Sequence, residues 1–252
     1  MFDFKSIALW TFAIFSLSTA VFGKLPPYIK ACKADANLES CVLAQQEQVI
    51  ARLSNGDPMN KIHSFNPMEV HELTVLDNGA SRSVAMNITF RDMKIWGLPD
   101  GRLTNFWLNK TEKRIRWKID LPKGLKILSK YKVGGKILVL PLQGDGDIEV
   151  LMGGAKLEFS ILYDEVKKGK KKVMFIKSTE LTHDLDSMKI RMDNLFNGDK
   201  ALGDNLNLVM NDNWQEMNRQ IGPSITKALG LASKPLLDRF VSGATIEEIF
   251  PQ

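Results

Sequence analysis

Apolar and polar residues alternate along the middle of the chain, from about residue 68 to residue 192, with the period typical of β-strands. The clearest segment is KRIRWKIDLP, where charged residues separate Ile115, Trp117, Ile119 and Leu121. The same alternation recurs in KLEFSILYDE, KVMFIKS and SMKIRMD. Because no helical pattern separates these strands, we expect one antiparallel, meandering sheet with one buried face.

Helical patterns flank this region on both sides. The segment NLESCVLAQQEQVIARLSNG indicates one amphipathic helix, with Asn37 as its N-cap and Gly56 at its end. After Gly198, apolar residues recur every three or four positions. An unbroken helix from there to residue 241 would be about 65 Å long, so we expect Pro223 to kink or break it. The pattern predicts a single α+β domain in which a curved sheet surrounds a long helix.

Short segments rich in glycine are predicted to separate the strands: DNG (77–79), PDG (99–101), VGG (133–135) and GDGD (144–147). The segment GDGDIE also places three acidic residues at alternate positions, which raises the question of calcium. It lacks the twelve-residue loop of a calcium site. The sequence therefore favours a bulged turn leading into a strand, and no metal site is predicted.

The N-terminus has the pattern of a signal peptide. One lysine precedes a short apolar run, which small residues follow, and the run is shorter than the roughly 20 residues that span a bilayer. Cleavage is expected after Ala20 or Gly23, which makes residues 1–23 a signal peptide and residues 24–252 one secreted domain. Stable membrane insertion is not predicted.

Export to an oxidising compartment agrees with two other features of the sequence. Cys32 and Cys41 are the only cysteines and lie close together, which predicts a disulfide that pins an N-terminal segment. So short a loop adds about 3 kcal/mol of stability at most. Asn87 and Asn109 begin N-glycosylation triplets, and the alternation around Asn87 places it on the solvent face of a strand.

The charge distribution of the chain is not that of a nucleic-acid-binding protein. The net charge is +5, and the basic residues are spread along the chain instead of forming the stripe of a nucleic-acid-binding protein. The one basic run is KKGKKK, at 167–172. It reads as a solvated hairpin tip, with a site for anionic lipid headgroups as the alternative.

Motifs for catalysis are missing from the sequence. The three histidines are His63, His71 and His183. HELTV lacks the second histidine of a zinc protease helix, and no G-x-S-x-G motif occurs. We therefore predict a protein that is not an enzyme and uses no cofactor. What remains is apolar surface with 11 methionines, a residue that adapts to irregular binding surfaces, although periodicity alone cannot distinguish a solid core from a cavity.

The order of several segments carries a resemblance. CKADANLESC is followed by NGDP, FRDMKIWGL, YKVGGKILVLPLQGDG, NLFNGDKALGDNLNLVMNDNW and IFP. In this order the mature chain resembles, over essentially its whole length, the insect takeout and juvenile hormone binding protein family. The resemblance implies a tubular lipid-binding fold with an internal apolar tunnel. It also implies a carrier, expected to be monomeric, for a terpenoid such as juvenile hormone or a fatty-acid-like lipid. Hormone carriers of the family have a second disulfide, so this chain is closer to the takeout branch.

The resemblance also suggests where a ligand would bind. Trp214 is predicted to be a structural anchor and the Cys32–Cys41 segment a gate. Tyr131 is a candidate polar contact, with an ordinary core residue whose hydroxyl bonds to the backbone as the alternative. Two alternatives remain. One is a membrane-surface or lipopolysaccharide-binding defence protein that uses the basic run, and the other is a signalling module whose bound lipid only stabilises it for an unknown receptor. The predicted ligand-binding residues come from the first helix, the strands and the long helix: Val42, Val49, Leu53, Trp117, Tyr131, Val133, Leu157, Phe159, Met188, Met192, Leu206, Met210 and Met217.

Overall fold

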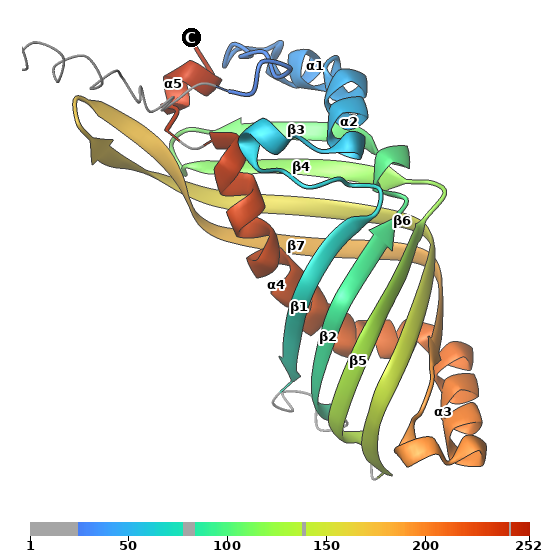
Figure 1. The fold of residues 1–252 in the computed structure, drawn as a ribbon. Coiled ribbons are helices and arrows are strands. Elements are labelled where there is room, and N and C mark those ends of the chain that lie inside the picture. The colour runs from blue at the N-terminus through green and yellow to red at the C-terminus, as the bar shows by residue number, and fades with distance from the viewer. Residues whose placement is uncertain (1–24, 78–83, 138–139, 242) are drawn as a thin grey trace, which may run out of the picture.

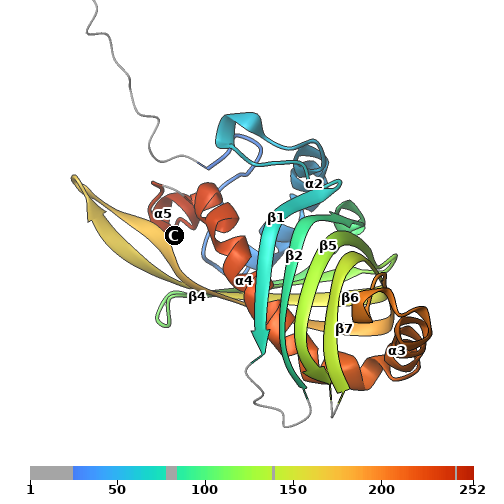
Figure 2. The same cartoon turned by 60° about the horizontal axis from the view of Figure 1, so that its bottom comes forward.

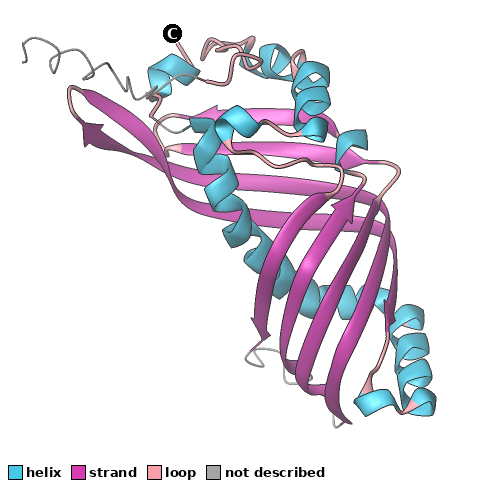
Figure 3. Cartoon of the chain, in the orientation of Figure 1, coloured by secondary structure: helices cyan, strands magenta, loops and turns pink. Residues whose placement is uncertain are grey.

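The computed structural model describes residues 25–77, 84–137, 140–241 and 243–252. One curved antiparallel sheet and a long C-terminal helix make up most of the molecule (Figures 1 and 3). The predicted α+β class is confirmed. The predicted signal peptide, at 1–23, and most of the DNG segment lie outside the described residues.

Seven strands form the sheet, and every pairing between them is antiparallel. Their order in space is β1-β2-β5-β6-β4-β3, and β7 also pairs with β6. The predicted meander is therefore wrong, because β5 crosses to pair with β2. The strands are β1 (Met68–Asp77), β2 (Val84–Trp96), β3 (Arg102–Asn109), β4 (Arg114–Leu121), β5 (Leu125–Ile137), β6 (Leu140–Lys168) and β7 (Lys171–Met192).

Strand β6 joins two differently directed parts of the sheet (Figure 1). Its first part, up to Met152, pairs with β5, and its later part, from Ala155, pairs with β4. Between them lie Gly153 and Gly154, and Gly154 has a φ of +57°, a left-handed conformation that favours glycine. The change of partner thus coincides with a change in strand direction.

Two of the predicted turns are wrong. The VGG segment lies inside β5, and GDGD lies inside β6. Their glycines serve close packing: a Cβ on Gly146 would lie 2.4 Å from the Asp193 carbonyl oxygen, and one on Gly144 would lie 2.6 Å from the Tyr131 hydroxyl. By contrast, the PDG segment does form a turn, with a short 3-10 helix, η2 (Leu98–Asp100).

The predicted first helix is two helices, α1 (Leu38–Leu43) and α2 (Gln46–Asn55). Asn37 precedes α1, but its side chain makes no capping bond. The predicted end is confirmed, since Gly56 follows α2 with a φ of +80°. A 3-10 turn, η1 (Pro58–Asn60), leads from there toward the sheet.

The C-terminal helix breaks at a different residue from the one predicted. Helices α3 (Lys200–Asp212) and α4 (Trp214–Val241) meet at Asn213, whereas Pro223 lies inside α4. A short 3-10 helix, η3 (Phe196–Gly198), precedes α3, and α5 (Ile246–Ile249) ends the chain. None of the helices in the described ranges is long and apolar enough to cross a membrane.

Two asparagines dock α3 on the edge of β7. The Asn207 side chain accepts from Met192 N and donates to Met192 O, both at 2.9 Å. Asn211 does the same with the backbone of Ile190, at 2.8 and 2.7 Å. The two asparagines are four residues apart on the helix, a rise of about 6 Å. Their two partners are two residues apart on the strand, about 6.6 Å, so both asparagines can bond to the strand at once. The helix thereby covers a strand edge that would otherwise expose unpaired groups.

Helix α4 completes a tube. It contacts both β1 and β7, which are the two outer strands where the sheet runs β1-β2-β5-β6-β7. Figure 2 shows α4 passing behind the curved strands β1, β2 and β5. Because the helix bridges the two outer strands, the apolar faces of sheet and helix enclose a common interior.

Candidate functional site

The interior holds an apolar cavity of about 840 Å³ between α4 and the concave face of the sheet. The alternation along β4 explains its wall, since Ile115, Trp117 and Ile119 all face it. Trp117 stacks on Phe159 of β6, with ring centroids 5.1 Å apart. On α4 the helical period brings Met217, Ile221 and other apolar residues to the same space.

The structure brings most of the predicted ligand-binding residues together on this wall. Their contact with a ligand stays a prediction, but their location agrees with it. The residues that line the cavity are Val42, Val49, Leu53, Trp117, Val133, Leu157, Phe159, Met188, Met192, Met210 and Met217.

Tyr131 has the second of its two predicted roles, that of a core residue bonded to the backbone, and is not a polar contact for a ligand. It lies outside the cavity wall, is only 2 % exposed, and its hydroxyl donates to the Asp193 carbonyl oxygen at 2.7 Å. Burial raises the pKa of Tyr131 to about 12, and the charges of Asp193 and Asp145 add to this. The side chain therefore fastens β5 to the segment that follows β7 and has no free polar group for a ligand.

Tyr131→Phe is expected to destabilise the protein by about 1 to 2 kcal/mol, because the hydrogen bond between the buried Tyr131 side chain and the Asp193 carbonyl oxygen is lost. Ligand affinity should not change. Urea unfolding and a ligand titration of the same variant check both statements. A change in affinity without a loss of stability would show that Tyr131 contacts the ligand.

Two further helical residues also lie away from the cavity wall. Leu206 packs on the buried cluster that includes Leu195 and Met210, whereas Met210 of the same helix lines the cavity. Trp214 packs beside Leu121, Leu185 and Met188, which agrees with its predicted role as an anchor.

Several wall residues were missed. They belong to β2, β5, β6, β7 and α4. The alternation or the helical period predicts the inward side of each element but does not show which inward residues line a cavity. They include Phe90, Met93, Ile95, Ile127, Val150, Ile225 and Leu229, together with the polar residues His183 and Asn218.

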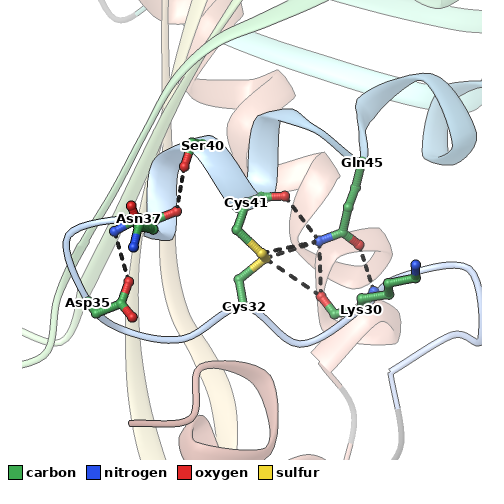
Figure 4. The surroundings of a disulfide bond; sticks show 7 residues. All are labelled: Lys30, Cys32, Asp35, Asn37, Ser40, Cys41 and Gln45. Atoms are coloured by element: carbon green, nitrogen blue, oxygen red, sulfur yellow. Dashed lines mark hydrogen bonds between the residues drawn. A yellow bond between two sulfur atoms is a disulfide. The ribbon is translucent and has the colours of Figure 1, made fainter.

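The N-terminal segment covers one part of the cavity. Cys32 and Cys41 form the predicted disulfide, and Cys32 lines the cavity together with Val42. Figure 4 shows Gln45 beside the disulfide, where its side chain accepts from Lys30 N at 2.6 Å and donates to Lys30 O at 3.1 Å. That this segment opens as a gate stays a prediction.

Side chains of α1 and α2 hold this cover on the edge of the sheet. The Glu39 carboxylate accepts from Phe106 N at 3.1 Å, and Gln46 Oε1 accepts from Leu103 N at 2.9 Å. Both amides belong to β3, the outer strand of its part of the sheet. The two helices thus bind to strand groups that have no neighbouring strand.

Both predicted glycosylation sites are accessible. Asn87 is exposed on β2 between the buried residues Met86 and Ile88, as the alternation predicted, and Asn109 is exposed at the end of β3. Modification of either stays a prediction. Within the described ranges, no cluster of three or more His, Cys, Asp or Glu side chains is placed to hold a metal ion.

Comparison with known proteins decides the family. The sequence matches the family described as "Haemolymph juvenile hormone binding protein (JHBP)" over residues 10–251. The chain belongs to this family. The resemblance carried by the sequence motifs is therefore confirmed.

Relatives within and around the family agree with this assignment. The chain is 24% identical over 235 residues to the "Circadian clock-controlled protein daywake" of Drosophila melanogaster, covering 89% of this chain and 88% of that protein. It is 23% identical over 231 residues to the Drosophila yakuba protein of the same name, with the same coverage. Takeout 1 of Epiphyas postvittana superposes with a TM-score of 0.71 at 21% identity, covering 89% of this chain and 100% of that one. The tubular takeout fold is thus confirmed.

Proposed function

We propose that the protein is a secreted carrier that binds one small hydrophobic ligand, a terpenoid or a fatty-acid-like lipid, without altering it chemically. The observation that carries the proposal is the apolar cavity of about 840 Å³ inside the tube. Ligand pockets span about 300 to 1,000 Å³ and are mostly apolar with a few polar groups. Burying apolar surface there contributes about 25 cal/mol per Å².

Membership in a family named for juvenile hormone binding supports a hydrophobic ligand. Secretion is supported by the signal-peptide pattern of residues 1–23 and by the Cys32–Cys41 disulfide, since disulfides persist in oxidising compartments. The carrier is proposed to work as a monomer.

Uptake of a fluorescent naphthylamine probe tests this function. The mature protein should take up the probe saturably, at about one per chain, and long-chain alcohols, acids or terpenoids should displace it. Hexanol should displace it far more weakly, because it buries less apolar area. A protein that takes up no probe and no long-chain compound would contradict the carrier function.

A second candidate, binding to anionic lipid surfaces, rests on the β6–β7 hairpin. The hairpin extends beyond the rest of the sheet (Figures 1 and 2) and turns at Gly169 and Lys170. It exposes Val166 and Phe175 next to the basic run. One lysine is already engaged, because Lys171 pairs with Glu248 of α5 and holds the pKa of that carboxyl below its usual value, with the Thr245 amide adding to the effect.

Replacing Lys170 and Lys172 by Gln separates the two candidates, since it leaves the Lys171 pair intact. If the hairpin binds membranes, the variant should lose most of its sedimentation with phosphatidylserine vesicles, whereas probe uptake should stay the same. Lys132→Gln/Lys136→Gln, on exposed positions of β5, is the matched control. A wild-type protein that does not sediment with the vesicles would exclude this second function.

A further inference from the structure

A polar pair lies in the apolar wall, where β7 faces α4. His183 Nε2 and Asn218 Oδ1 are 2.6 Å apart, and both residues line the cavity. On the sheet, His183 lies between Leu181 and Leu185 and opposite Leu157 of β6, and all three leucines also line the cavity. The pair is therefore a polar point in an apolar surface.

The neighbouring helix residue makes room for this pair. A Cβ on Gly222 would lie 2.9 Å from His183 Cε1 and 2.8 Å from Asn218 Oδ1, closer than carbon and oxygen atoms normally approach. Any larger residue at this position would push the ring and the amide out of place. The sequence thus carries a glycine where the histidine needs space against α4.

Three other polar residues of the wall bond to the backbone of the protein. Gln46 accepts from Leu103 N, Ser54 donates to Ile50 O, and Ser233 donates to Gly230 O. The contact between His183 and Asn218 instead joins two side chains that both face the cavity. These two residues therefore differ from Gln46, Ser54 and Ser233, whose hydrogen bonds go to the backbone.

The remaining capacity follows from the geometry. Since the amide Oδ1 accepts, His183 Nε2 donates, and Nδ1 of the neutral ring is then an acceptor. The Asn218 Nδ2 group carries two hydrogens, and within the described part of the chain no hydrogen bond from it or to His183 Nδ1 is formed. The pair can thus offer one acceptor and at least one donor to a molecule in the cavity.

We propose that His183 and Asn218 are the residues that select the ligand by its polar group. This inference rests on the carrier function proposed above. The group that fits is compact and both donates and accepts, as a hydroxyl or a protonated carboxyl group does, and it is attached to a long apolar chain. A hydrocarbon leaves both side chains without a partner, and polar groups left unpaired in an apolar site are unfavourable.

An ionised head group fits this position less well. A buried charge needs a partner of opposite sign, and the basic wall residue on the same helix, Arg239, is 21 residues further along α4, or about 30 Å at 1.5 Å per residue. Its guanidinium also bonds to the Lys61 carbonyl. While the His183 ring is neutral, the pair therefore favours a neutral polar group.

The test compares dodecanol with tridecane, two chains of equal length, by displacement of the naphthylamine probe. The measured quantity is the ratio of the tridecane Kd to the dodecanol Kd. His183→Phe and Asn218→Leu should each lower this ratio about tenfold, the value of one neutral hydrogen bond. The matched controls are His71→Phe and Asn205→Leu, at exposed positions on β1 and α3, and they should leave the ratio unchanged.

The outcomes separate the two proposals. A wild-type protein that binds neither compound contradicts the carrier function itself. Binding of both compounds with the same ratio in wild type and variants overturns only the role of the pair. Should a variant fail to fold, ¹⁵N-histidine spectra of the wild-type protein, which has three histidines, decide: dodecanol should shift the His183 Nδ1 resonance and tridecane should not, and equal effects of the two would overturn the inference.

Discussion

Ile225→Trp is expected to lower the affinity for a long-chain ligand at least tenfold while costing less than about 1.5 kcal/mol of stability. Ile225 lies on α4 and lines the cavity, so the larger side chain enters space that a ligand would occupy. In a solid core the same change would force neighbours apart, and that commonly costs about 1 to 3 kcal/mol. Probe displacement and urea unfolding of the same preparation measure the two effects.

Leu231→Trp is the matched control, because Leu231 lies on the same helix, is 57% exposed and does not line the cavity. It should change neither quantity. The cavity would lose its assigned role if Ile225→Trp bound ligand as tightly as the wild type, or if both variants weakened binding equally.

Gly124→Ala is expected to destabilise the protein by at least about 3 kcal/mol. Gly124 lies in the turn between β4 and β5 with a φ of +74°, and a Cβ there would lie 1.8 Å from the Met152 carbonyl oxygen. The obstructing atom belongs to the backbone of β6, so it cannot rotate away. The turn would have to move away from the strand at the place where β6 changes partner.

Gly169→Ala separates the cost of the left-handed backbone conformation from the cost of the steric clash. Gly169, at the tip of the β6–β7 hairpin, has a similar φ of +63°, but nothing lies within 4 Å of the position that its added methyl group would take. It should lose only the left-handed preference of glycine, about 1 kcal/mol. Equal losses in the two variants, measured by urea unfolding, would show that the contact with Met152 has no energetic consequence.

The strands could be predicted from the sequence because one face of each strand is exposed to solvent and the other is buried. Alternation along β4 identified its buried face, and the same residues, Ile115, Trp117 and Ile119, line the cavity. The order of the strands could not be predicted, since antiparallel strands of similar pattern pair equally well in several orders. The length of β6, which pairs with β5 and then with β4, decides the order.

Local rules failed where tertiary contacts override them. Glycines 144 and 146 read as a turn, but inside β6 they allow Tyr131 and Asp193 to approach the strand. Pro223 predicted a kink or a break, yet α4 continues through it and the break lies at Asn213. Packing along β1 and β7 supports α4 beyond what local propensity indicates.

The cavity itself lay beyond sequence reasoning. An apolar stripe on α4 looks the same whether the opposite wall touches it or stands back, so Met217 could have been core or lining. His183 and Asn218 belong to different elements, 35 residues apart, and no local pattern connects them. Their pairing follows only from the way α4 crosses the tube.

Native mass spectrometry of the secreted protein, followed by organic extraction and identification of what leaves it, tests the carrier function most directly. We expect one lipid or terpenoid per chain, with a hydroxyl or carboxyl group, and its loss from Ile225→Trp but not from Leu231→Trp. An empty wild-type protein that also fails to take up added long-chain compounds would contradict a ligand-filled tube.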